Sequence, residues 1–372
     1  MKTSTERILT THTGSLPRPA DLTDRHDPDA VRSAVAETVR RQVETGVDIV
    51  NDGEVSKAGY STYVTERLSG FGGEPVQVWR RGADQFPEFF ARTFGEPKLA
   101  AAAAGNPSCD GPVAYLDPSQ VEADIANLLA SRDGAAEAFM SAASPGVIDM
   151  FMPNRYYPTT EEYLFALADA MKTEYDAIHQ AGLVLQLDCP DLACLWAREP
   201  QRTLEEFRGM VTQRLQAIDY ATRDIPPDRL RVHLCWGNYE GPHNTDIPLA
   251  DIIDLVLAAR PAAISFEGAN PRHEHEWKIF EDITLPDGKI LIPGVLDSTT
   301  NYIEHPELVA QRLVRYASLV GKENVIAGTD CGFATFAAVV PVDPKITWAK
   351  FAAMAEGARL ATRELWPAPT HA

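Results

Sequence analysis

Three residues of the types that bind transition metals stand out in the sequence. His233 and Cys235 lie one residue apart in the apolar segment RVHLCW, and Cys331 follows far downstream in VIAGTDCGF. On a strand, side chains i and i+2 point to the same side, so the first two could hold one ion at a strand end. Imidazole and thiolate suit Zn²⁺, and three protein ligands leave a fourth position for a carboxylate or an exchangeable substrate. The alternative is that both are ordinary core residues, because free cysteine packs as a small hydrophobe.

Positioning these ligands requires strands, and the chain carries eight candidate strands separated by amphipathic stretches. The candidates are LTTHTGSL (9–16), VDIVNDG (47–53), AFMSAAS (138–144), LVLQLD (183–188), RVHLCW (231–236), AAISFEG (262–268), ILIPGVLD (290–297) and NVIAGTD (324–330). Eight β/α units without a long linker predict an α/β fold, a single (β/α)₈ barrel spanning residues 1–372, rather than a doubly wound sheet. Neither a GxGxxG motif nor a Walker loop follows any of these segments, which argues against dinucleotide and P-loop folds.

The intervening stretches have helical periodicity. Val31, Val35, Val39 and Val43 recur at intervals of four, and Gly46 predicts the end of that helix. A later helix is predicted to begin at Pro306, to carry an apolar face and to end before Gly321. The apolar face comprises Leu308, Val309, Leu313, Ala317 and Val320.

An insertion of about eighty residues, roughly 55–135, separates the second and third candidate strands. It contains VQVWRR and GPVAYLD, which could pair as a hairpin, the aromatic run QFPEFFARTF and the alanine-rich stretch LAAAAAGNPSCDG. We expect it to cap the barrel mouth, because loops of this length are usually lids or linkers. The alternative is an outer decoration with no part in chemistry.

Active sites of such barrels lie at the carboxyl ends of the strands, and a polar residue follows each candidate strand. These residues are Ser15, Glu54, Ser144, Asp188, His233 with Cys235, Glu267, Asp297 and Cys331. Their convergence at one mouth predicts a binding site. For any single serine or aspartate, the alternative is a helix cap or a loop hydrogen bond.

In their order and spacing these motifs resemble a known family. THTGSLP, DIVNDGE, LQLDCPDL, RVHLCW, ISFEG, PGVLD and GTDCG are similar to the C-terminal barrel of cobalamin-independent methionine synthase, a group that includes epoxyalkane:coenzyme M transferases. The resemblance covers nearly the whole chain and implies a barrel of the methionine synthase/uroporphyrinogen decarboxylase type.

The resemblance also implies roles for individual residues. His233, Cys235, Glu267 and Cys331 would bind zinc, and Ser15, Glu54 and Asp188 would hold homocysteine. Coordination to Zn²⁺ deprotonates a thiol, which makes it a nucleophile towards an alkyl carbon. Two carboxylates fit the ammonium of an amino-acid thiol better than the sulfonate of coenzyme M. The expected activity is therefore zinc-dependent methyl or other alkyl transfer to homocysteine, with methyltetrahydrofolate or a smaller molecule as donor.

Three departures from the family bear on the donor. The chain has one barrel, whereas the full-length family enzyme has a second one at its N-terminus. The element after the third strand reads SPGVIDMFMPNRYY, with Met152, Tyr156 and Tyr157 where the family stacks a tryptophan on the pterin. Ser298, Thr299 and Thr300 follow PGVLD, where the family places a histidine that protonates the leaving group. Two other functions stay open: thiol addition to an epoxide or other electrophile, and a non-catalytic zinc-binding barrel that serves as a binding partner.

Further candidates lie on the loops. His243 is our candidate for the missing general acid, with His273 and His275 as the other loop histidines. Arg18 could bind a substrate carboxylate or form a surface ion pair. His12, within the first candidate strand, is expected to be structural or to face the site.

Composition limits the partners and the compartment. The net charge of −19 over 372 residues argues against binding to nucleic acid or to anionic membranes, both of which need a basic face. The start lacks an apolar signal segment, and no stretch approaches eighteen apolar residues, so a cytoplasmic protein is expected. Five cysteines fit a reducing compartment better than a disulfide framework.

Overall fold

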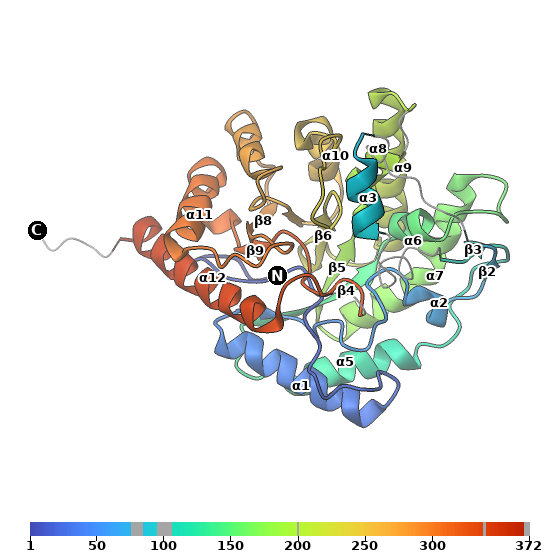
Figure 1. Cartoon of the computed structure of the whole chain (residues 1–372), viewed down its shortest axis with the longest axis horizontal. Helices are drawn as coiled ribbons and strands as arrows, with labels where there is room; N and C mark the ends of the chain where they lie inside the picture. Colours follow the sequence, from blue (N-terminus) through green and yellow to red (C-terminus); the bar gives the residue numbers. More distant parts are fainter. Residues whose placement is uncertain (76–84, 95–105, 199–200, 338–339, 368–372) are drawn as a thin grey trace, which may run out of the picture.

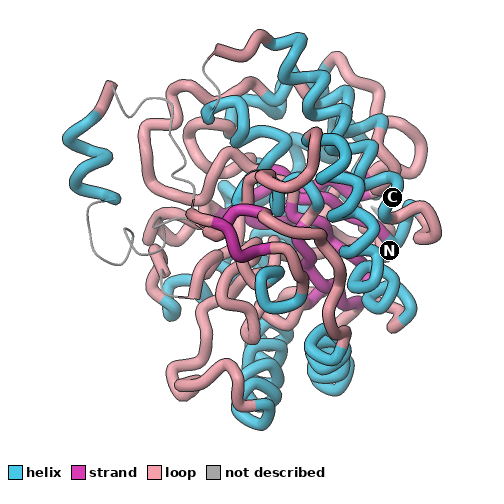
Figure 2. The backbone as a smooth tube through the Cα atoms, turned by 90° about the vertical axis from the view of Figure 1, so that its right-hand side faces the viewer, coloured by secondary structure: helices cyan, strands magenta, loops and turns pink. Residues whose placement is uncertain are grey.

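The computed structural model describes residues 1–75, 85–94, 106–198, 201–337 and 340–367, and it shows an α/β barrel (Figure 1). Seven parallel strands form one sheet in the order β1-β4-β5-β6-β7-β8-β9. They are β1 Ile49–Val50, β4 Glu137–Ala143, β5 Val184–Asp188, β6 Leu230–Leu234, β7 Ala263–Phe266, β8 Ile290–Leu296 and β9 Gly328–Thr329. Figure 2 shows the strands at the centre with helices around them. The predicted barrel fold is confirmed.

The first predicted strand is the exception. Residues 9–16 form one ladder bridge, Thr10 with Ala327, and the Thr10 carbonyl accepts from the amides of Asp48 and Ile49. The segment thus lies between β9 and β1 and joins the two edges of the sheet. Two backbone N–H groups of this segment donate to side-chain oxygens, where a regular strand would donate to carbonyls of its neighbour. Thr10 N–H donates to Asp48 Oδ2, and Thr13 N–H donates to Thr329 Oγ1. The expectation of a full strand over 9–16 is therefore wrong, although the position in the barrel is as expected.

Helices cover the outside of the sheet. The longer ones are α1 Pro28–Glu44, α5 Ser119–Ser131, α7 Thr160–Gln180, α9 Leu204–Ala221, α11 Pro306–Val320 and α12 Pro344–Leu365. The shorter ones are α2 Val64–Arg67, α3 Pro87–Phe94, α6 Pro145–Phe151, α8 Asp191–Arg198 and α10 Ile253–Ala258, with 3₁₀ turns η1 Pro227–Arg229, η2 Leu249–Asp251, η3 Glu274–Glu281 and η4 Lys322–Asn324. The predicted helix with valines at intervals of four is α1, and the one predicted to begin at Pro306 is α11, which ends just before Gly321, as predicted.

Apolar side chains fill one end of the barrel interior. A compact buried cluster comes from the beginnings of the strands and of the closing segment: Leu9, Ile49, Phe139, Val184, Ala263, Ile290, Ile292 and Ile326. This layer closes the amino-terminal end, so polar residues at the carboxyl ends line the opposite mouth. Burial of the sheet on both faces explains why the strands read as almost continuous apolar runs in the sequence.

The insertion contacts the mouth. Gly59 pairs with Phe336 in an antiparallel bridge, and Tyr60 N–H donates to the Thr335 carbonyl. Further on, Gln85, just before α3, accepts from Asn244 Nδ2 of the loop after β6 at 2.9 Å. These contacts bring the insertion to the end of the barrel where the candidate site lies. Its role as a cap stays a prediction.

The predicted hairpin of VQVWRR with GPVAYLD lies partly outside the described residues. Antiparallel pairing joins β2 Phe71–Gly73 to β3 Ser108–Cys109, and Leu68 bridges to Tyr115 of GPVAYLD. The VQVWRR segment, residues 76–81, lies outside the described residues. Helix α5, which lies between β1 and β4 in the chain, packs beside α1 on the outside of the barrel (Figure 1).

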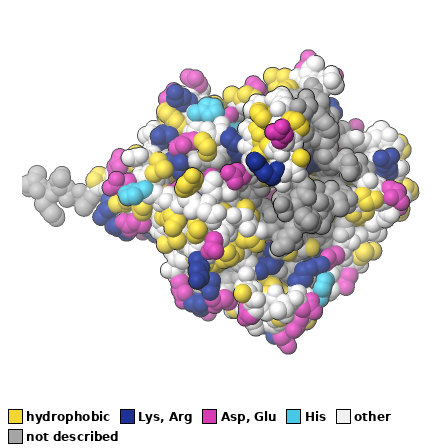
Figure 3. Space-filling model, in the orientation of Figure 1, with side chains coloured by type: hydrophobic (Ala, Val, Ile, Leu, Met, Phe, Trp, Pro, Cys, Tyr) yellow, Lys and Arg dark blue, Asp and Glu magenta, His cyan; other side chains and the backbone are white. Residues whose placement is uncertain are grey.

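On the surface seen in Figure 3, acidic and basic side chains are interspersed. Within the described ranges no helix is long and apolar enough to cross a membrane.

Candidate metal centre

His233, Cys235 and Cys331 converge at the carboxyl end of the barrel. His233 is in β6, Cys235 directly follows that strand, and Cys331 follows β9. All three are buried, and their ligand atoms lie within 4.8 Å of one another. Zn–S bonds of about 2.3 Å and Zn–N bonds of about 2.0 Å would place such atoms about 3.5–3.8 Å apart. A small contraction would therefore let the group hold an ion.

The donor set has the chemistry that a soft or borderline cation needs. His233 Nδ1 lies 3.1 Å from the Ser265 hydroxyl of the neighbouring β7, which leaves Nε2 as the nitrogen without a partner among the described residues. Burial and then the charge of Arg231 lower the pKa of His233 to about 3, so the imidazole is neutral. Burial raises the pKa of Cys331 to about 12. A cation is what would stabilise its thiolate.

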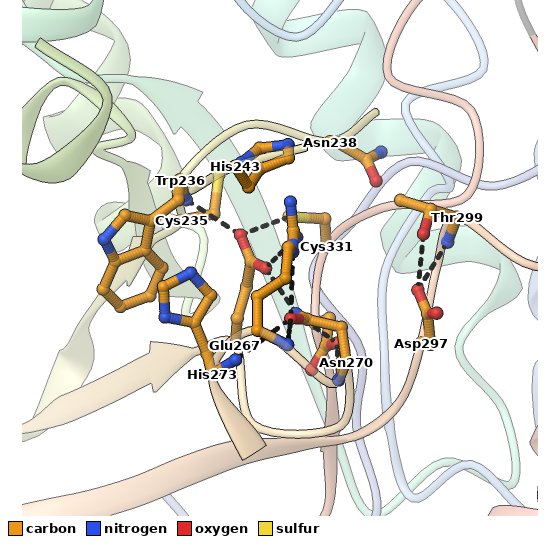
Figure 4. A network of polar contacts seen from close by, with 12 residues as sticks. Cys235, Trp236, Asn238, His243, Glu267, Asn270, His273, Asp297, Thr299 and Cys331 are labelled. Carbon is orange, nitrogen blue, oxygen red and sulfur yellow. Dashed lines mark hydrogen bonds and ion pairs between the residues drawn. The ribbon is translucent and has the colours of Figure 1, made fainter. Parts of the chain in front are cut away.

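Glu267 lies beside this group but is held by other residues (Figure 4). Its Oε1 accepts from the backbone N–H of Trp236 at 2.8 Å and lies 3.9 Å from Cys331 Sγ. Its Oε2 accepts from Asn270 Nδ2 at 2.5 Å and from Arg272 Nη2 at 2.7 Å. The structure thus places the predicted fourth ligand next to the three, while the cluster of mutually close ligand atoms comprises only the other three.

Asp330 fixes the loop that carries these partners. Its Oδ1 accepts from the backbone N–H groups of Gly268 and Ala269, and its Oδ2 from the N–H and side-chain amide of Asn270, all at 2.8–2.9 Å. Burial, followed by the charge of Glu267, raises the pKa of Asp330. Any side chain on Gly294 would collide with the Asp330 carboxylate, because a Cβ there would lie 2.0 Å from Oδ1.

Two further carboxylates are buried at the same mouth. Asp188 ends β5 in register with His233 of β6, so both side chains face the same side of the sheet. Burial and then the charge of Glu54 raise the pKa of Asp188 well above its usual value. Glu54 accepts from the Ser141 hydroxyl at 2.7 Å and has a left-handed backbone with φ 56°. A buried non-glycine residue in that conformation is strained, as is common at functional sites.

Ser15 and Arg18 adjoin these groups in different ways. A Cβ on Gly332 would lie 1.9 Å from Ser15 Oγ, which places the Ser15 hydroxyl beside the residue after Cys331. The Arg18 guanidinium donates to the carbonyls of Glu54 at 3.0 Å, Val55 at 3.2 Å and Lys57. Arg18 therefore braces the loop that carries Glu54 instead of forming the surface ion pair considered above.

Ser144 and Asp297 are engaged in local caps. Ser144 Oγ accepts from Val147 N–H as the N-cap of α6 and lies 3.2 Å from Asp191 Oδ1. Asp297 accepts from the N–H and hydroxyl of Thr299 at 2.8 Å and from the Thr300 hydroxyl at 3.0 Å. Both lie at the predicted strand ends; Ser144 is bound by α6 and by Asp191 of α8, and Asp297 by the threonines of its own loop. A substrate-binding role for either stays a prediction.

His243 and His273 join one network, whereas His275 is exposed. His243 Nδ1 lies 2.8 Å from Asp246 Oδ2, and its Nε2 lies 3.2 Å from the Tyr239 carbonyl. The same Asp246 oxygen lies 3.2 Å from Nε2 of His273, whose Nδ1 contacts Glu276 at 2.8 Å. With both ring nitrogens engaged, His243 as the general acid stays a prediction. His12 is structural in its contacts, because its ring nitrogens pair with Gln42 and with the Gly14 amide.

Asn270, Arg272 and Cys194 also belong to the surroundings of this site, although no motif in the sequence indicated them. Asn270 and Arg272 follow Glu267 in a loop without periodicity, and only their types marked them as possible partners of a carboxylate. Cys194, in α8, contacts the Cys235 carbonyl at 3.4 Å, and its thiol also interacts with that of Cys235. Cys194 therefore lies next to the group formed by His233, Cys235 and Cys331, but it is not one of that group.

The charge of His273 leads to a prediction about how the free energy of unfolding depends on pH. Burial lowers its pKa, but the carboxylates of Asp246 and Glu276 outweigh burial and raise the pKa to about 9. Because the unfolded value is about 6.5, this group stabilises the fold fully below pH 6.5 and loses its contribution as the pH rises through 9. We expect His273→Gln to lower the free energy of unfolding by on the order of 3 kcal/mol at pH 6, and by much less at pH 9.5.

Urea unfolding at both pH values measures this difference. His26→Gln, which changes an exposed histidine, is the control and should have little effect at either pH. An equal loss of stability at both pH values in His273→Gln would show that the imidazole is not charged in the folded protein.

Comparisons with known proteins agree with this architecture. No family model matches the sequence. The chain is 23% identical over 339 residues to a methionine synthase of Thermococcus kodakarensis, covering 91% of this chain and 84% of that protein. It is 24% identical over 376 residues to a methionine synthase of Saccharolobus solfataricus, covering 96% of each.

Solved structures show the same fold. A B12-independent methionine synthase from Shewanella sp. W3-18-1, in complex with selenomethionine, superposes with a TM-score of 0.75 at 20% identity over 96% of this chain and 99% of that chain. A methyltransferase from Methanosarcina mazei gives a TM-score of 0.56 at 12% identity over 95% and 94%. The resemblance to cobalamin-independent methionine synthases is confirmed along nearly the whole chain.

Proposed function

We propose that this relative of the cobalamin-independent methionine synthases is a zinc-dependent methyltransferase that acts on the sulfur of homocysteine. One observation carries the proposal: two cysteines and a histidine with mutually close ligand atoms stand beside Asp188, a buried carboxylate in register with the histidine. Zinc bound there would supply the positive charge that keeps a thiol deprotonated near neutral pH. The curated relatives named methionine synthase support this choice. A cytoplasmic location is part of the same proposal.

Each ligand has a role that its surroundings support. His233 would bind through Nε2, with the Ser265 hydroxyl holding its other nitrogen. Cys235 and Cys331 would bind as thiolates, which keeps the site electron-rich and preserves the nucleophilicity of a bound substrate sulfur. Glu267 would be the fourth ligand or a close neighbour.

Glu54 and Asp188 would hold the ammonium of the amino-acid thiol. Burial, and then the charge of Glu54, raises the pKa of Asp188, so the two carboxylates lie close enough for the charge of one to act on the other. A cationic ligand between them would relieve that repulsion, whereas the sulfonate of coenzyme M would increase it. Lys57, one of the cations whose charge acts on Asp188, donates to the Ser141 carbonyl at 2.6 Å. Ser15 would contact the same substrate, and Arg18 would keep the Glu54 loop in place.

Thiol binding tests this function. Glu54→Gln and Asp188→Asn should each weaken homocysteine binding to the zinc-loaded protein about ten- to a hundredfold, because a charge-assisted hydrogen bond contributes roughly 1.5–3 kcal/mol. Zinc content should stay at one ion per chain. Calorimetric titration gives the affinity, and mass spectrometry of a reaction with a methyl donor identifies methionine as the product.

Asp191→Asn is the matched control, because it changes a buried carboxylate in the next helix that contacts Ser144 and Arg214. It should leave thiol affinity unchanged. Tight binding of coenzyme M that is indifferent to Glu54 and Asp188 would replace homocysteine by a sulfonated thiol. Zinc retention without affinity for any thiol would favour the non-catalytic barrel.

A further inference from the structure

Glu267 sits in a set of three donors that we name the carboxylate cradle: the backbone N–H of Trp236, Asn270 Nδ2 and Arg272 Nη2. We propose that Asn270 and Arg272 are positioning residues that hold Glu267 back from the metal, so that a substrate thiol takes the fourth position. The inference rests on the proposed metal site and concerns residues to which nothing above gives a role in the reaction.

The cradle competes with a metal for the same carboxylate. Oε1 lies 3.9 Å from Cys331 Sγ, while Oε2 accepts the hydrogen bonds of Asn270 and Arg272. Arg272 also forms an ion pair with that oxygen, and Glu267 is only 1% exposed. In such a buried setting an ion pair is screened little by water. Binding of Oε1 to a cation would have to draw the carboxylate away from Arg272 or share its charge.

The cradle is rigid rather than adaptable. Asn270 is itself fixed by Asp330 through its backbone and side-chain amides, and its Oδ1 accepts from Arg272 Nε at 3.0 Å. Arg312 braces the same loop from behind by donating to the Ala269 carbonyl at 2.9 Å. Figure 4 shows Asn270 and Glu267 facing one another beside Cys331. Because these donors are already held in place, little free energy is lost in ordering them around Glu267. They therefore oppose movement of the Glu267 carboxylate towards an ion.

A metal titration with four proteins tests the inference: wild type, Arg272→Gln, Glu267→Gln and the double variant. Zinc-free protein is titrated with Zn²⁺ against a chromophoric chelator, and with Co²⁺ while the visible spectrum is recorded. Arg272→Gln should tighten zinc binding about ten- to a hundredfold, because it frees Glu267 to bind the ion. In the Glu267→Gln background, the same change should alter zinc affinity less than about threefold. The Co²⁺ spectrum should differ between wild type and Arg272→Gln only when Glu267 is present.

A tightening that persists in the Glu267→Gln background would overturn the inference, because Arg272 would then act only as a nearby positive charge. Unchanged or weaker binding in Arg272→Gln would overturn it as well. Arg312→Gln is the control for a loosened loop, and it should leave both spectra and affinity as in the wild type. If wild type bound neither ion, the proposed metal site itself would fail, a result that differs from metal binding that is insensitive to Arg272.

Discussion

Cys331→Ala and Cys235→Ala are each expected to abolish metal retention in a protein that stays folded. Binding free energies of roughly 10–16 kcal/mol for four-ligand zinc sites correspond to about 2.5–4 kcal/mol per ligand, or about seventy- to nine-hundredfold in affinity. Removing one of only three close ligands should cause a loss at the upper end of that range. Metal analysis after gel filtration should give close to one zinc per chain for the wild type and none for either variant.

The fold should survive, because the cluster at the carboxyl end is separate from the apolar layer that fills the amino-terminal end of the barrel. Thermal unfolding measures this. Cys109→Ala is the matched control, since Cys109 is equally buried but lies in β3 of the insertion. Full zinc in Cys235→Ala or Cys331→Ala would contradict the proposed site, whereas loss of zinc in Cys109→Ala would point to a general effect of cysteine removal.

The barrel could be predicted from the sequence because its strands are buried on both faces. Such strands read as continuous apolar runs, and the residue after each run lies at the same end of the barrel. That topological rule was enough to bring His233, Cys235 and Cys331 together from segments almost a hundred residues apart. The rule fixes where a residue lies but not what its side chain contacts.

Side-chain partners depend on loop conformation, which has no periodic signal. Ser144 and Asp297 obey the same rule as Asp188, yet they cap their own loops. Arg18 was expected to bind a substrate carboxylate or to form a surface ion pair; it donates to three carbonyls, and the substrate role stays a prediction. The cradle around Glu267 depends on residues three and five positions further on, in a loop held by Asp330. Short-range turns of this kind are decided by tertiary contacts.

The identity of the methyl donor could not be predicted from the sequence for the same reason, but the structure narrows the choice between folate and a smaller donor. Phe151, at the end of α6 after the third barrel strand, meets Tyr60 and Phe336 edge to face, with ring centroids 5.9 and 6.3 Å away. The guanidinium of Arg198 lies 5.4 Å above its ring. A pterin could not stack on that face without displacing Arg198. Phe151 therefore offers no open platform for folate on that face.

The three residues that follow Asp297 also offer no suitable proton donor for a folate leaving group. Thr299 and Thr300 are bound to the Asp297 carboxylate, and the Ser298 hydroxyl donates to Asn238 Oδ1 at 2.9 Å. An aliphatic hydroxyl is a poor general acid at neutral pH. A folate amine must take up a proton as it leaves, whereas a small sulfonium ion departs as a neutral thioether and needs none. The folate donor therefore needs a general acid in the site, whereas the sulfonium donor does not.

We therefore expect the zinc-loaded protein to methylate homocysteine from trimethylsulfonium at least about a hundredfold faster than from methyltetrahydrofolate triglutamate at equal concentration. General acid catalysis alone typically contributes about 10²- to 10⁴-fold, and only the folate reaction depends on it. Mass spectrometry of methionine formed with each donor measures the ratio, and the zinc-free protein gives the background. Methionine formation from the folate triglutamate at about 1 per second or more would contradict this expectation. In that case an acid such as His243 must leave the Tyr239 carbonyl and reach the leaving group.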